Sequence, residues 1–370
     1  MRKVGFIGWR GMVGSVLMER MLAHEDFSKL APSFFTTSQT GESYALTKEQ
    51  SFVLKDAKDL SKLAEQDVLV SCQGGDYTSE IHPKLRAMGW KGYWIDAAST
   101  LRLSNEAMIC LDPLNRADLD RGIDKGIKDF VGGNCTVSLM LMAMGGLFKA
   151  DLVEFVSSQT YQAASGGGAL HMRELLQQMR LIGQSLEKDL NNPQVGILEI
   201  DQKLNSILRE GELPTACFGR PLAGNLLPWI DSAMPSGQSR EEWKAQVEAN
   251  KILGRSENPI MIDGTCVRVS SMRCHSQALM VKLKKKTPLK QIEEMIAAHN
   301  PWVEVVENTP DQTKAQLTPV YASGTLKIPV GRLRHLTMGE DYLNAFTVGD
   351  QLLWGAAEPL RLMLLQILKV

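Results

Sequence analysis

The sequence predicts an α/β protein with a doubly wound, mostly parallel sheet in its N-terminal third and a second domain after it. Three observations lead to this expectation. Short apolar runs alternate with amphipathic stretches as far as residue 131, the pattern of parallel strands joined by crossover helices. The first apolar run leads into a glycine-rich turn and an amphipathic helix. Beyond residue 135 the pattern changes, and residues 155–162 alternate like a strand with one polar face.

Length and composition exclude several classes of protein. A chain of 370 residues is long enough for two domains with separate cores. The formal net charge of −1 does not indicate a nucleic-acid surface. The N-terminus lacks a secretory signal segment, and no apolar run approaches the ~20 residues of a membrane span. The six scattered cysteines have neither metal-site nor disulfide-framework spacing. We therefore expect a soluble, cytoplasmic protein without a metal, a nucleic-acid partner or a membrane partner.

The first predicted strand, Val4–Ile7, is followed by a glycine turn and an amphipathic helix. In this context glycines bind a pyrophosphate group at the helix N-terminus. The glycines are Gly8, Gly11 and Gly14, in the spacing G-x-x-G-x-x-G rather than G-x-G-x-x-G. A tight turn without a ligand is therefore the alternative.

The second predicted strand, residues 33–37, distinguishes between the two nicotinamide dinucleotides. Its end carries no Asp or Glu, the residue that would bind the ribose 2′-hydroxyl of NAD. The hydroxyl side chains of Thr37 and Ser38, with Arg10 nearby, suit a 2′-phosphate instead. The pattern predicts a Rossmann-like domain that binds NADP.

Three polar or reactive residues follow further strands of the same predicted sheet. These strands cover residues 68–72, 94–96, 109–111 and 130–131. Gln73, Arg102 and Cys135 lie just past strand ends, and ligands collect at the carboxyl ends of parallel strands. One crevice could hold all three residues, with Arg102 binding an anion. A solvated surface arginine is the alternative.

Cys135 stands between a Gly-Gly-Asn turn, residues 132–134, and an amphipathic run from Leu139 to Lys149. At the start of a helix, backbone N–H groups and the helix dipole favour an anion, which lowers the pKa of a thiol. The alternative is a small buried hydrophobic residue. The turn favours the first interpretation, so we expect Cys135 to be a nucleophile.

Candidate residues for chemistry continue in the second part of the chain. After the strand at 155–162 and a glycine turn, a helix is predicted from Ala169 to Leu186, whereas residues 191–228 show no assignable pattern. A helix is predicted to begin after Ser239, which is suited to its N-cap.

Four charged or titratable residues follow Ser239. Glu241 and Lys244 share a face of its helix, where a surface ion pair is the alternative to a ligand role. Arg268 lies on an apolar strand, so its burial would demand an anionic partner. His275, at a strand edge, titrates in a useful range, although a lone histidine is more often structural.

The last part of the chain predicts a helix at Leu289–His299, a strand at 303–306 and a C-terminal helix. The C-terminal helix has an apolar stripe, which we expect to cover the sheet of the first domain. Pro359 is expected to kink it.

Several motifs are long enough to be specific. They are Gly-Phe-Ile-Gly-Trp-Arg-Gly-Met-Val-Gly (5–14), Gly-Gly-Asn-Cys-Thr-Val (132–137), and residues 72–77, 161–168, 240–244, 267–269, 273–277 and 346–355. With these motifs the chain resembles aspartate-β-semialdehyde dehydrogenases of the Gram-negative bacterial type along essentially its whole length. Residues 40–58 and 304–318 match poorly and are interpreted as surface variation.

The resemblance implies a domain division and an assembly. Residues 1–133, completed by the C-terminal helix 355–370, form the NADP-binding domain. Residues 134–354 form an α+β catalytic and dimerisation domain of the glyceraldehyde-3-phosphate dehydrogenase type. The protein is accordingly expected to be a homodimer.

The resemblance also implies a covalent mechanism. Cys135 attacks the aldehyde of aspartate semialdehyde to form a thiohemiacetal, hydride passes to NADP, and phosphate releases the acyl thioester as β-aspartyl phosphate. Biosynthesis of lysine, threonine, methionine and isoleucine uses the reverse direction. His275 is implied to be the general acid or base, and Gln162 to orient the substrate beside the thioester.

Binding residues follow from the same resemblance. Arg268 is implied to clamp the substrate α-carboxylate as a two-pronged donor, and Glu241 to bind its α-ammonium group. Arg102, Asn134 and Lys244 are implied to bind phosphate. The residues implied to line NADP are Gly8, Arg10, Gly11, Met12, Val13, Gly14, Thr37, Ser38, Gln73, Ser165, Gly166, Pro193 and Gln351.

Three other functions compete with this one. An N-acetylglutamyl-phosphate reductase-like enzyme has the same architecture but no use for an acidic residue such as Glu241 facing an ammonium group. Glyceraldehyde-3-phosphate dehydrogenase chemistry is disfavoured because the second strand lacks the NAD-type acid. An NADP-binding redox sensor with Cys135 as its oxidisable thiol would not need Arg268, Lys244 and His275 in one site.

Overall fold

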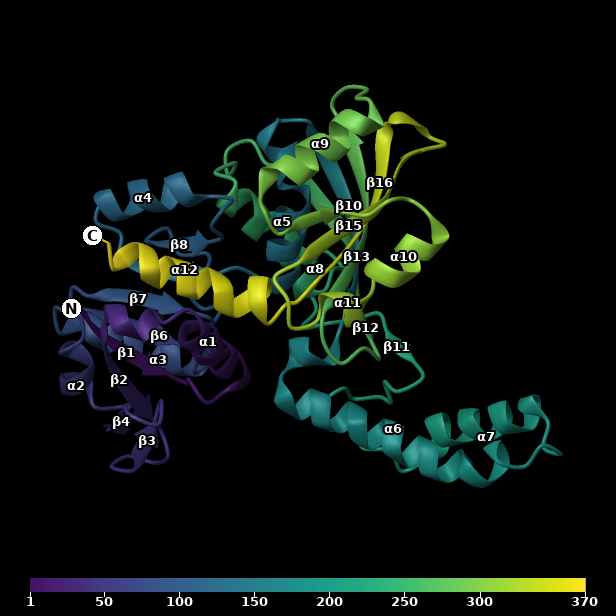
Figure 1. Ribbon diagram of the computed structural model, residues 1–370, viewed down its shortest axis with the longest axis horizontal. Coiled ribbons are helices and arrows are strands. Elements are labelled where there is room, and N and C mark those ends of the chain that lie inside the picture. Colours follow the sequence, from purple (N-terminus) through teal and green to yellow (C-terminus); the bar gives the residue numbers. More distant parts are fainter. Residues whose placement is uncertain (370) are drawn as a thin grey trace.

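The computed structural model describes residues 1–369 and contains two seven-stranded sheets (Figure 1). The first sheet has the order β5-β2-β1-β6-β7-β9-β8, and all its paired strands are parallel. Its strands are β1 (Lys3–Ile7), β2 (Ala31–Thr36), β5 (Lys55–Asp56), β6 (Val68–Ser71), β7 (Tyr93–Asp96), β8 (Ala107–Cys110) and β9 (Asp129–Gly132). The sheet confirms the predicted doubly wound fold, and β5 is the one strand of it that the sequence did not indicate.

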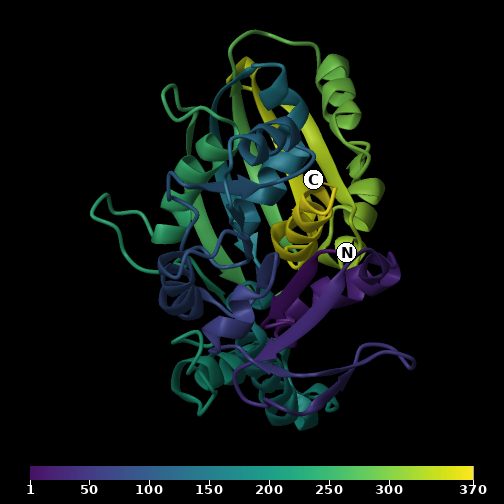
Figure 2. The ribbon, with the colours of Figure 1, turned by 90° about the vertical axis from the view of Figure 1, so that its left-hand side faces the viewer.

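Helices cover both faces of this sheet. One face packs against α1 (Met12–Ala23), α4 (Arg116–Asp124) and α12 (Glu358–Ile367) in a single apolar cluster. The other face packs against α2 (Leu60–Ala64) and α3 (Gly75–Ala87). The C-terminal α12 contacts β7, β8 and β9 (Figure 2), which confirms that the C-terminal helix covers the first sheet.

Short elements complete the N-terminal part. They are η1 (Asp26–Lys29) and a hairpin of β3 (Ser43–Ala45) and β4 (Ser51–Val53). Residues 40–58 therefore contain short strands, where the sequence indicated only surface variation. The division into residues 1–133 with 355–370, and 134–354, remains a prediction, and its last residue, Val370, lies outside the described residues.

The predicted C-terminal helix is not one regular helix. Leu353–Ala357 form a π-helical turn, and the α-helix begins at Glu358, so Pro359 lies in its first turn. Proline is tolerated there because the first N–H groups of a helix have no intrahelical acceptor. The irregularity expected at Pro359 therefore lies in the turn before it, and such π turns are frequent at functional sites.

The second sheet is mixed, with the order β11-β12-β10-β13-β16-β15-β14. Its strands are β10 (Val153–Gln162), β11 (Leu226–Leu227), β12 (Met261–Val269), β13 (His275–Leu283), β14 (Val303–Val305), β15 (Ile328–Leu336) and β16 (Gly339–Gly349). The sequence did not indicate β11 or β15. It also did not indicate β16, because residues 345–352 were interpreted only as the segment that leads into the C-terminal helix. β12 and β13 pair with opposite edges of β10. The C-terminal end of the parallel β12 and the N-terminal end of the antiparallel β13 therefore both lie beside the C-terminal end of β10.

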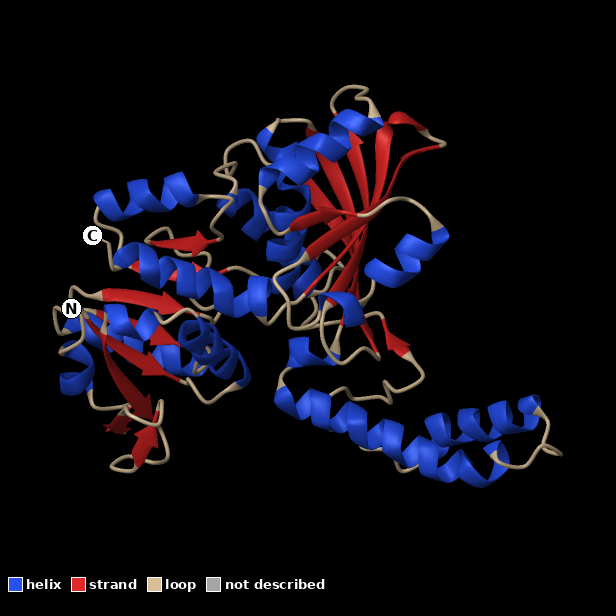
Figure 3. Cartoon of the chain, in the orientation of Figure 1, coloured by secondary structure: helices blue, strands red, loops and turns tan. Residues whose placement is uncertain are grey.

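The second part has its own helices (Figure 3). They are α5 (Cys135–Lys149), α6 (Ala169–Leu190), α7 (Ile197–Glu210), α8 (Arg240–Ile252), α9 (Leu289–His299), α10 (Pro310–Gln316) and α11 (Pro319–Ala322), with the short turn η2 (Ala164–Gly167). α6 and α7 form a hairpin that projects from the molecule (Figure 1). α7 lies in the stretch for which the sequence showed no pattern. Ser239 caps α8 as predicted, in a capping box with Glu242.

The central helix α5 connects the two sheets. It follows β9 directly, and every residue from Thr136 to Phe148 is buried. Its sequence is apolar on all sides, as expected for a helix surrounded by other elements. α5 packs on α8, α9, the π-helical turn η3 (Leu353–Ala357) and the second sheet, so its first residue, Cys135, is fixed at the junction of the two sheets.

The docking of α12 predicts a stability effect. Leu364 is fully buried in the cluster under the first sheet. Leu364→Ala should lower the free energy of unfolding by about 3 kcal/mol, because it removes buried surface and leaves a cavity. The measurement is urea unfolding followed by circular dichroism. Val320→Ala, at an 89% exposed position, is the control and should change the value by less than about 0.5 kcal/mol. Equal effects of the two substitutions would contradict the packing described here.

Candidate active site

A cavity of about 480 Å³ lies where the two parts of the chain meet, and it gathers most of the predicted site residues. The predicted residues that line it are Met12, Val13, Arg102, Asn134, Cys135, Gln162, Ser165, Gly166, Glu241, Lys244, Arg268 and Gln351. A second cavity of about 320 Å³ is lined by Gly8, Arg10, Gly11, Thr37 and Gln73. The other predicted residues, Gly14, Ser38, Pro193 and His275, line neither cavity.

Asn134 fixes the start of α5. Its side-chain Oδ1 accepts from the N–H groups of Thr136, at 3.0 Å, and Val137, at 3.3 Å, as an N-cap residue does. Cys135 is therefore the first helical residue, as the sequence predicted. Its partly exposed side chain lines the cavity.

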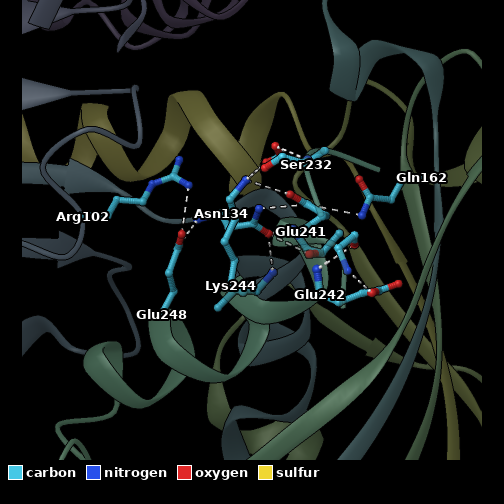
Figure 4. A network of polar contacts seen from close by, with 12 residues as sticks. Arg102, Asn134, Gln162, Ser232, Glu241, Glu242, Lys244 and Glu248 are labelled. Carbon is cyan, nitrogen blue, oxygen red and sulfur yellow. Dashed lines mark hydrogen bonds and ion pairs between the residues drawn. The ribbon is translucent and has the colours of Figure 1, made fainter. Parts of the chain in front are cut away.

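Glu241 and Lys244 form a polar network with Asn134 (Figure 4). Glu241 Oε1 accepts from Asn134 Nδ2 at 2.9 Å and from Gln162 Nε2 at 3.3 Å. Lys244 Nζ donates to Glu241 Oε2 at 3.2 Å and to Asp231 Oδ2 at 2.7 Å. Glu241 and Lys244 therefore form the ion pair considered as an alternative, but their side chains are only 7% and 13% exposed, so the pair lies at the cavity and not on the outer surface.

The charge of Lys244 is retained despite this burial. Burial lowers the pKa of its ammonium group, but the carboxylates of Glu241 and Asp231 outweigh it and hold the pKa above its ordinary value. Asp231, which the sequence did not indicate as a site residue, comes from the loop before α8 and has a left-handed φ of 73°. Lys244 therefore offers a permanent positive charge at the cavity wall.

Arg102 reaches the same cavity from the first sheet. Its Nε donates to the Gly132 carbonyl at 2.7 Å, and its Nη1 donates to Glu248 Oε1 at 3.2 Å. The residue is 9% exposed, which excludes the alternative of a solvated surface arginine. The cavity thus has two cations, Arg102 and Lys244, on the side nearest Asn134.

Arg268 ends β12 beside Gln162, with which it pairs in register. Its Nη1 donates to the Ala163 carbonyl at 2.7 Å. Burial of Arg268 was predicted to demand an anionic partner, and the hydrogen bond that its guanidinium makes is with a carbonyl. The 8% exposed residue lines the cavity, so an anionic ligand could supply the missing charge.

His275 lies behind this wall rather than on it. Its Nδ1 accepts from the Ala163 N–H at 3.1 Å, so a neutral ring carries its hydrogen on Nε2. Nε2 is buried without a hydrogen-bond partner in the described structure. Burial, reinforced by the charge of Arg268, lowers the pKa of His275 to about 3. His275 is therefore neutral at physiological pH, with Nε2–H as a donor.

Gly166 separates His275 from the cavity. A Cβ atom at this position would lie 2.8 Å from Arg268 Nη1, 2.9 Å from His275 Cε1 and 3.0 Å from His275 Nε2. Only a glycine leaves these side chains in place, and through it Nε2 lies next to the cavity. This is the physical role of the glycine turn that follows β10.

The second cavity has the features of a dinucleotide site. Gly8 has a left-handed φ of 70°, and a Cβ atom there would lie 2.5 Å from the backbone of Cys72 and Gln73. Gly14 approaches the Gly8 carbonyl in the same way, at 2.3 Å. The turn therefore needs its glycines for close packing, the role expected of the third glycine in a dinucleotide-binding turn. Arg10 Nη2 donates to Thr36 Oγ1 at 2.7 Å, at the end of β2.

Comparison with known proteins decides the family. The family model described as "Semialdehyde dehydrogenase, NAD binding domain" matches residues 3–121, and the one described as "Semialdehyde dehydrogenase, dimerisation domain" matches residues 144–354. The chain belongs to the semialdehyde dehydrogenase family. It is therefore an oxidoreductase that acts on an aldehyde with a nicotinamide dinucleotide, as predicted.

Solved structures agree with this family. An aspartate semialdehyde dehydrogenase from Francisella tularensis is 50% identical over 100% of both chains, with a TM-score of 0.94. This match confirms the resemblance seen in the sequence. Aspartate semialdehyde dehydrogenase II from Vibrio cholerae, complexed with ASA, is 21% identical over 100% of this chain and 98% of that one, with a TM-score of 0.79. The enzyme from Candida albicans, with NADP, is 14% identical over the same shares, with a TM-score of 0.65. The last two matches show the shared fold.

Besides Asp231, the sequence did not indicate Gly355 and Asp350 as residues that shape this semialdehyde dehydrogenase site. Gly355, in the π turn, would place a Cβ atom 2.7 Å from Cys135 Cβ. Asp350, fully buried, pairs with Arg273 Nε at 2.7 Å and so holds the turn before His275. In that turn Cys274 has a left-handed φ of 73°. Gly355 and Asp350 both lie within the motif 346–355, but only the fold shows what they contact.

Gln351 and Pro193 were both predicted to line NADP, and the structure places them differently. Gln351 lies at the main cavity, whereas Pro193 is exposed on a loop. Gln351 lines the main cavity, but its Oε1 also accepts from the Cys274 N–H at 2.9 Å and its Nε2 contacts Ser165 Oγ. It therefore joins the glycine turn to the turn before His275. Pro193 is exposed in the loop between α6 and α7, at the outer end of the projecting hairpin.

The prediction that the helix start lowers the pKa of the Cys135 thiol is wrong. Burial, with the charge of Glu241, raises this pKa to about 12, although Arg102 and Arg268 act in the opposite direction. Lack of solvation outweighs the helix dipole, which is worth at most ~2 kcal/mol. The thiol of this semialdehyde dehydrogenase is therefore protonated at neutral pH in the free site.

The raised pKa predicts a pH dependence for alkylation of Cys135. Because only the thiolate reacts, the rate with iodoacetamide should rise about tenfold per pH unit from about pH 7 to about pH 10 without a plateau. The rate is measured on the peptide containing Cys135 by mass spectrometry, in enzyme without ligands. A plateau beginning below about pH 8 would show a thiol activated in the free enzyme and would contradict this description.

Proposed function

We propose that this protein catalyses the NADP-dependent, phosphorylating oxidation of aspartate β-semialdehyde and its reverse, the reductive dephosphorylation of β-aspartyl phosphate. One observation carries the choice of substrate. The cavity that holds Cys135 also holds the carboxylate of Glu241 and the guanidinium of Arg268, which match an α-ammonium and an α-carboxylate group. The 50% identity to the Francisella enzyme supports the same substrate.

An amino-acid substrate explains Glu241 better than the competing functions do. An N-acetylglutamyl-phosphate reductase-like enzyme would bind an amide in place of the ammonium group, and a 7% exposed carboxylate would then face no cation of the substrate. A redox sensor would need only an accessible thiol. It would have no use for the three cations, Arg102, Lys244 and Arg268, that line this cavity.

The residues of this chain account for each step of the reaction. With the substrate held by Arg268 and Glu241, Cys135 Sγ adds to the aldehyde carbon to form a thiohemiacetal. The S–H bond of Cys135 breaks as the Sγ–C bond forms, and its proton passes to the aldehyde oxygen; the Nε2–H of His275 would donate a hydrogen bond to that oxygen and so assist the proton transfer as the general acid or base. Loss of hydride from the carbon and of the proton from its oxygen would give the acyl thioester. Gln162, beside Glu241, orients the resulting thioester. Phosphate, bound by Arg102, Lys244 and Asn134 Nδ2, then displaces Cys135.

The nicotinamide dinucleotide supplies the hydride acceptor when bound. Its pyrophosphate fits the turn of Gly8, Gly11 and Gly14, where close backbone packing leaves the N-terminus of α1 open to a ligand. Arg10 at the end of β2, with Thr37 and Ser38, supports NADP rather than NAD. Met12 and Val13, which follow Gly11 in the chain, line the larger cavity with Cys135, so they could extend the cofactor site toward it.

A homodimer and a cytoplasmic location are part of the proposal. α7 is amphipathic but has no buried residue, and Ile197 and Leu198 are 72% and 74% exposed. An apolar helix face of this kind is typical of an interface, which supports dimerisation through the second domain. No helix in residues 1–369 is long and apolar enough to cross a bilayer. A free thiol nucleophile suits a reducing compartment such as the cytoplasm.

One assay tests the proposed function. NADPH formation from aspartate semialdehyde should require phosphate, because phosphate releases the acyl group from Cys135. Cys135→Ser should reduce turnover by more than about a thousandfold, since an alcohol is a far poorer nucleophile, while NADP still binds. Binding of NADP is followed by calorimetric titration. Turnover independent of phosphate, or Cys135→Ser activity within about tenfold of wild type, would contradict the covalent mechanism.

The ligand roles of Lys244 and Glu241 predict a division between substrates. Lys244→Ala should raise the KM for phosphate by about tenfold or more and that for the semialdehyde much less, because it removes a positive charge facing the anion. Glu241→Ala should do the reverse, because the ammonium group loses its partner. Both Michaelis constants are measured for both variants. Parallel changes in the two constants would show that the pair acts structurally.

A further inference from the structure

Glu248 is a buried carboxylate on α8 that the mechanism above does not use. We propose that Glu248, assisted by Lys251, is a positioning residue for the phosphate site, which it orders by holding Arg102 and the backbone of Asn134. The proposal rests on the proposed function, because it takes phosphate as the ligand of Arg102. It concerns residues outside the predicted site and outside the cavity wall.

Both carboxylate oxygens of Glu248 are engaged. Oε1 accepts from Arg102 Nη1 at 3.2 Å, and Oε2 accepts from the Asn134 N–H at 2.7 Å (Figure 4). The Glu248 side chain is only 3% exposed. One carboxylate therefore joins two of the three groups proposed to bind phosphate. One of these comes from the first sheet, and the other is the N-cap of the helix that carries the nucleophile.

Lys251 holds the same loop by its backbone. Its Nζ donates to the carbonyl oxygens of Arg102 and Ser104, at 2.6 Å each. Glu248 and Lys251 thus bind the side chain and the main chain of one loop from one turn of α8. Such a double attachment leaves the loop little freedom to carry Arg102 away from the cavity.

The residues of α8 proposed to bind ligands and those proposed to position Arg102 lie at opposite ends of the helix. Glu241, Lys244, Glu248 and Lys251 recur at intervals of three, four and three residues, which places them along one face of the helix. Glu241 and Lys244, in its first two turns, line the cavity. Glu248 and Lys251, in its last two turns, bind the Arg102 loop instead. A single helix face therefore supplies both the ligands and the support of the anion site.

Electrostatics explain why a carboxylate is needed at this position. A guanidinium that is 9% exposed needs a countercharge before an anion arrives. Glu248 supplies it while engaging one of the five N–H groups of Arg102. Two others donate to the carbonyls of Gly132 and Ala97, so two remain for an anion. The opposite possibility is that Glu248 competes with phosphate for Arg102. The two possibilities predict changes of opposite sign when the charge of Glu248 is removed.

The first experiment uses Glu248→Gln, which keeps the size of the side chain and removes its charge. Inorganic phosphate is titrated into the full-length enzyme by calorimetry, and the KM values for phosphate and aspartate semialdehyde are measured. The Kd and KM for phosphate should each rise by about tenfold or more, whereas the KM for the semialdehyde should stay within about threefold. Glu257→Gln, the same change at an exposed position, is the control and should alter none of them. An unchanged or lowered phosphate Kd in Glu248→Gln would overturn the proposal.

A double-mutant cycle tests whether Glu248 acts through Arg102. Arg102→Ala alone should weaken phosphate binding, and adding Glu248→Gln should weaken it by less than about a further twofold. If the fold-increases in phosphate Kd caused by Arg102→Ala and by Glu248→Gln multiply in the double variant, Glu248 has a general structural role and the proposal is overturned. Lys251→Met, which removes both contacts with the loop backbone, should also raise the phosphate KM more than the semialdehyde KM. This variant decides the question if Glu248→Gln does not fold.

The same measurements separate this proposal from the proposed function. If wild-type enzyme neither binds phosphate nor needs it for turnover, the proposed function fails and this proposal fails with it. If wild-type enzyme binds and requires phosphate, but Glu248→Gln and Lys251→Met bind it equally well, only the positioning role of Glu248 is overturned.

Discussion

The active site depends on the hydrogen bonds of one residue, Asn134, at the start of α5. Its side-chain oxygen caps the helix, its side-chain nitrogen donates to Glu241, and its backbone N–H donates to Glu248. The cap sets where α5 begins and hence where Cys135 stands. The other two bonds tie that point to α8, which packs against α5. Because the rest of α5 is buried on all sides, the position of its first turn cannot adjust independently of the core.

The charges of the site are arranged so that each buried cation has a partner or faces the cavity. Arg102 is paired with Glu248, and Lys244 with Glu241 and Asp231, whereas Arg268 contacts only a carbonyl among the hydrogen bonds described above. Among these cations Arg268 alone has no ion pair described above. This asymmetry supports the proposal that Arg268 binds an anionic group of the substrate more strongly than it supports phosphate at Arg102, whose charge is already compensated.

Sequence periodicity was sufficient for the first sheet except β5, because its other strands are short, largely apolar runs. It was insufficient where tertiary contacts decide the structure. β15 contains Pro329, Gly331 and three basic residues, a composition that disfavours a strand, yet it lies between β14 and β16 in the sheet. Recognisable motifs allowed site residues to be predicted, but not Glu248, because its partner Arg102 lies 146 positions away. The pKa of Cys135 was misjudged because a local motif indicates the helix dipole but not the loss of solvation.

Glu241 links the proposed site for the semialdehyde's α-ammonium group to the proposed site for phosphate. In the free site its Oε2 is 3.2 Å from Lys244 Nζ, so the lysine ammonium occupies the position of a cation beside this carboxylate. An α-ammonium group bound there would compete with Lys244 for Glu241, since both cations need the same oxygen. Lys244 would then keep Asp231 as its partner and have an N–H group released toward the cavity it lines. Binding of the amino-acid substrate would in this way favour binding of phosphate at Lys244. Either ligand would separate Lys244 from Glu241, so the second ligand would bind without the free-energy cost of breaking that ion pair.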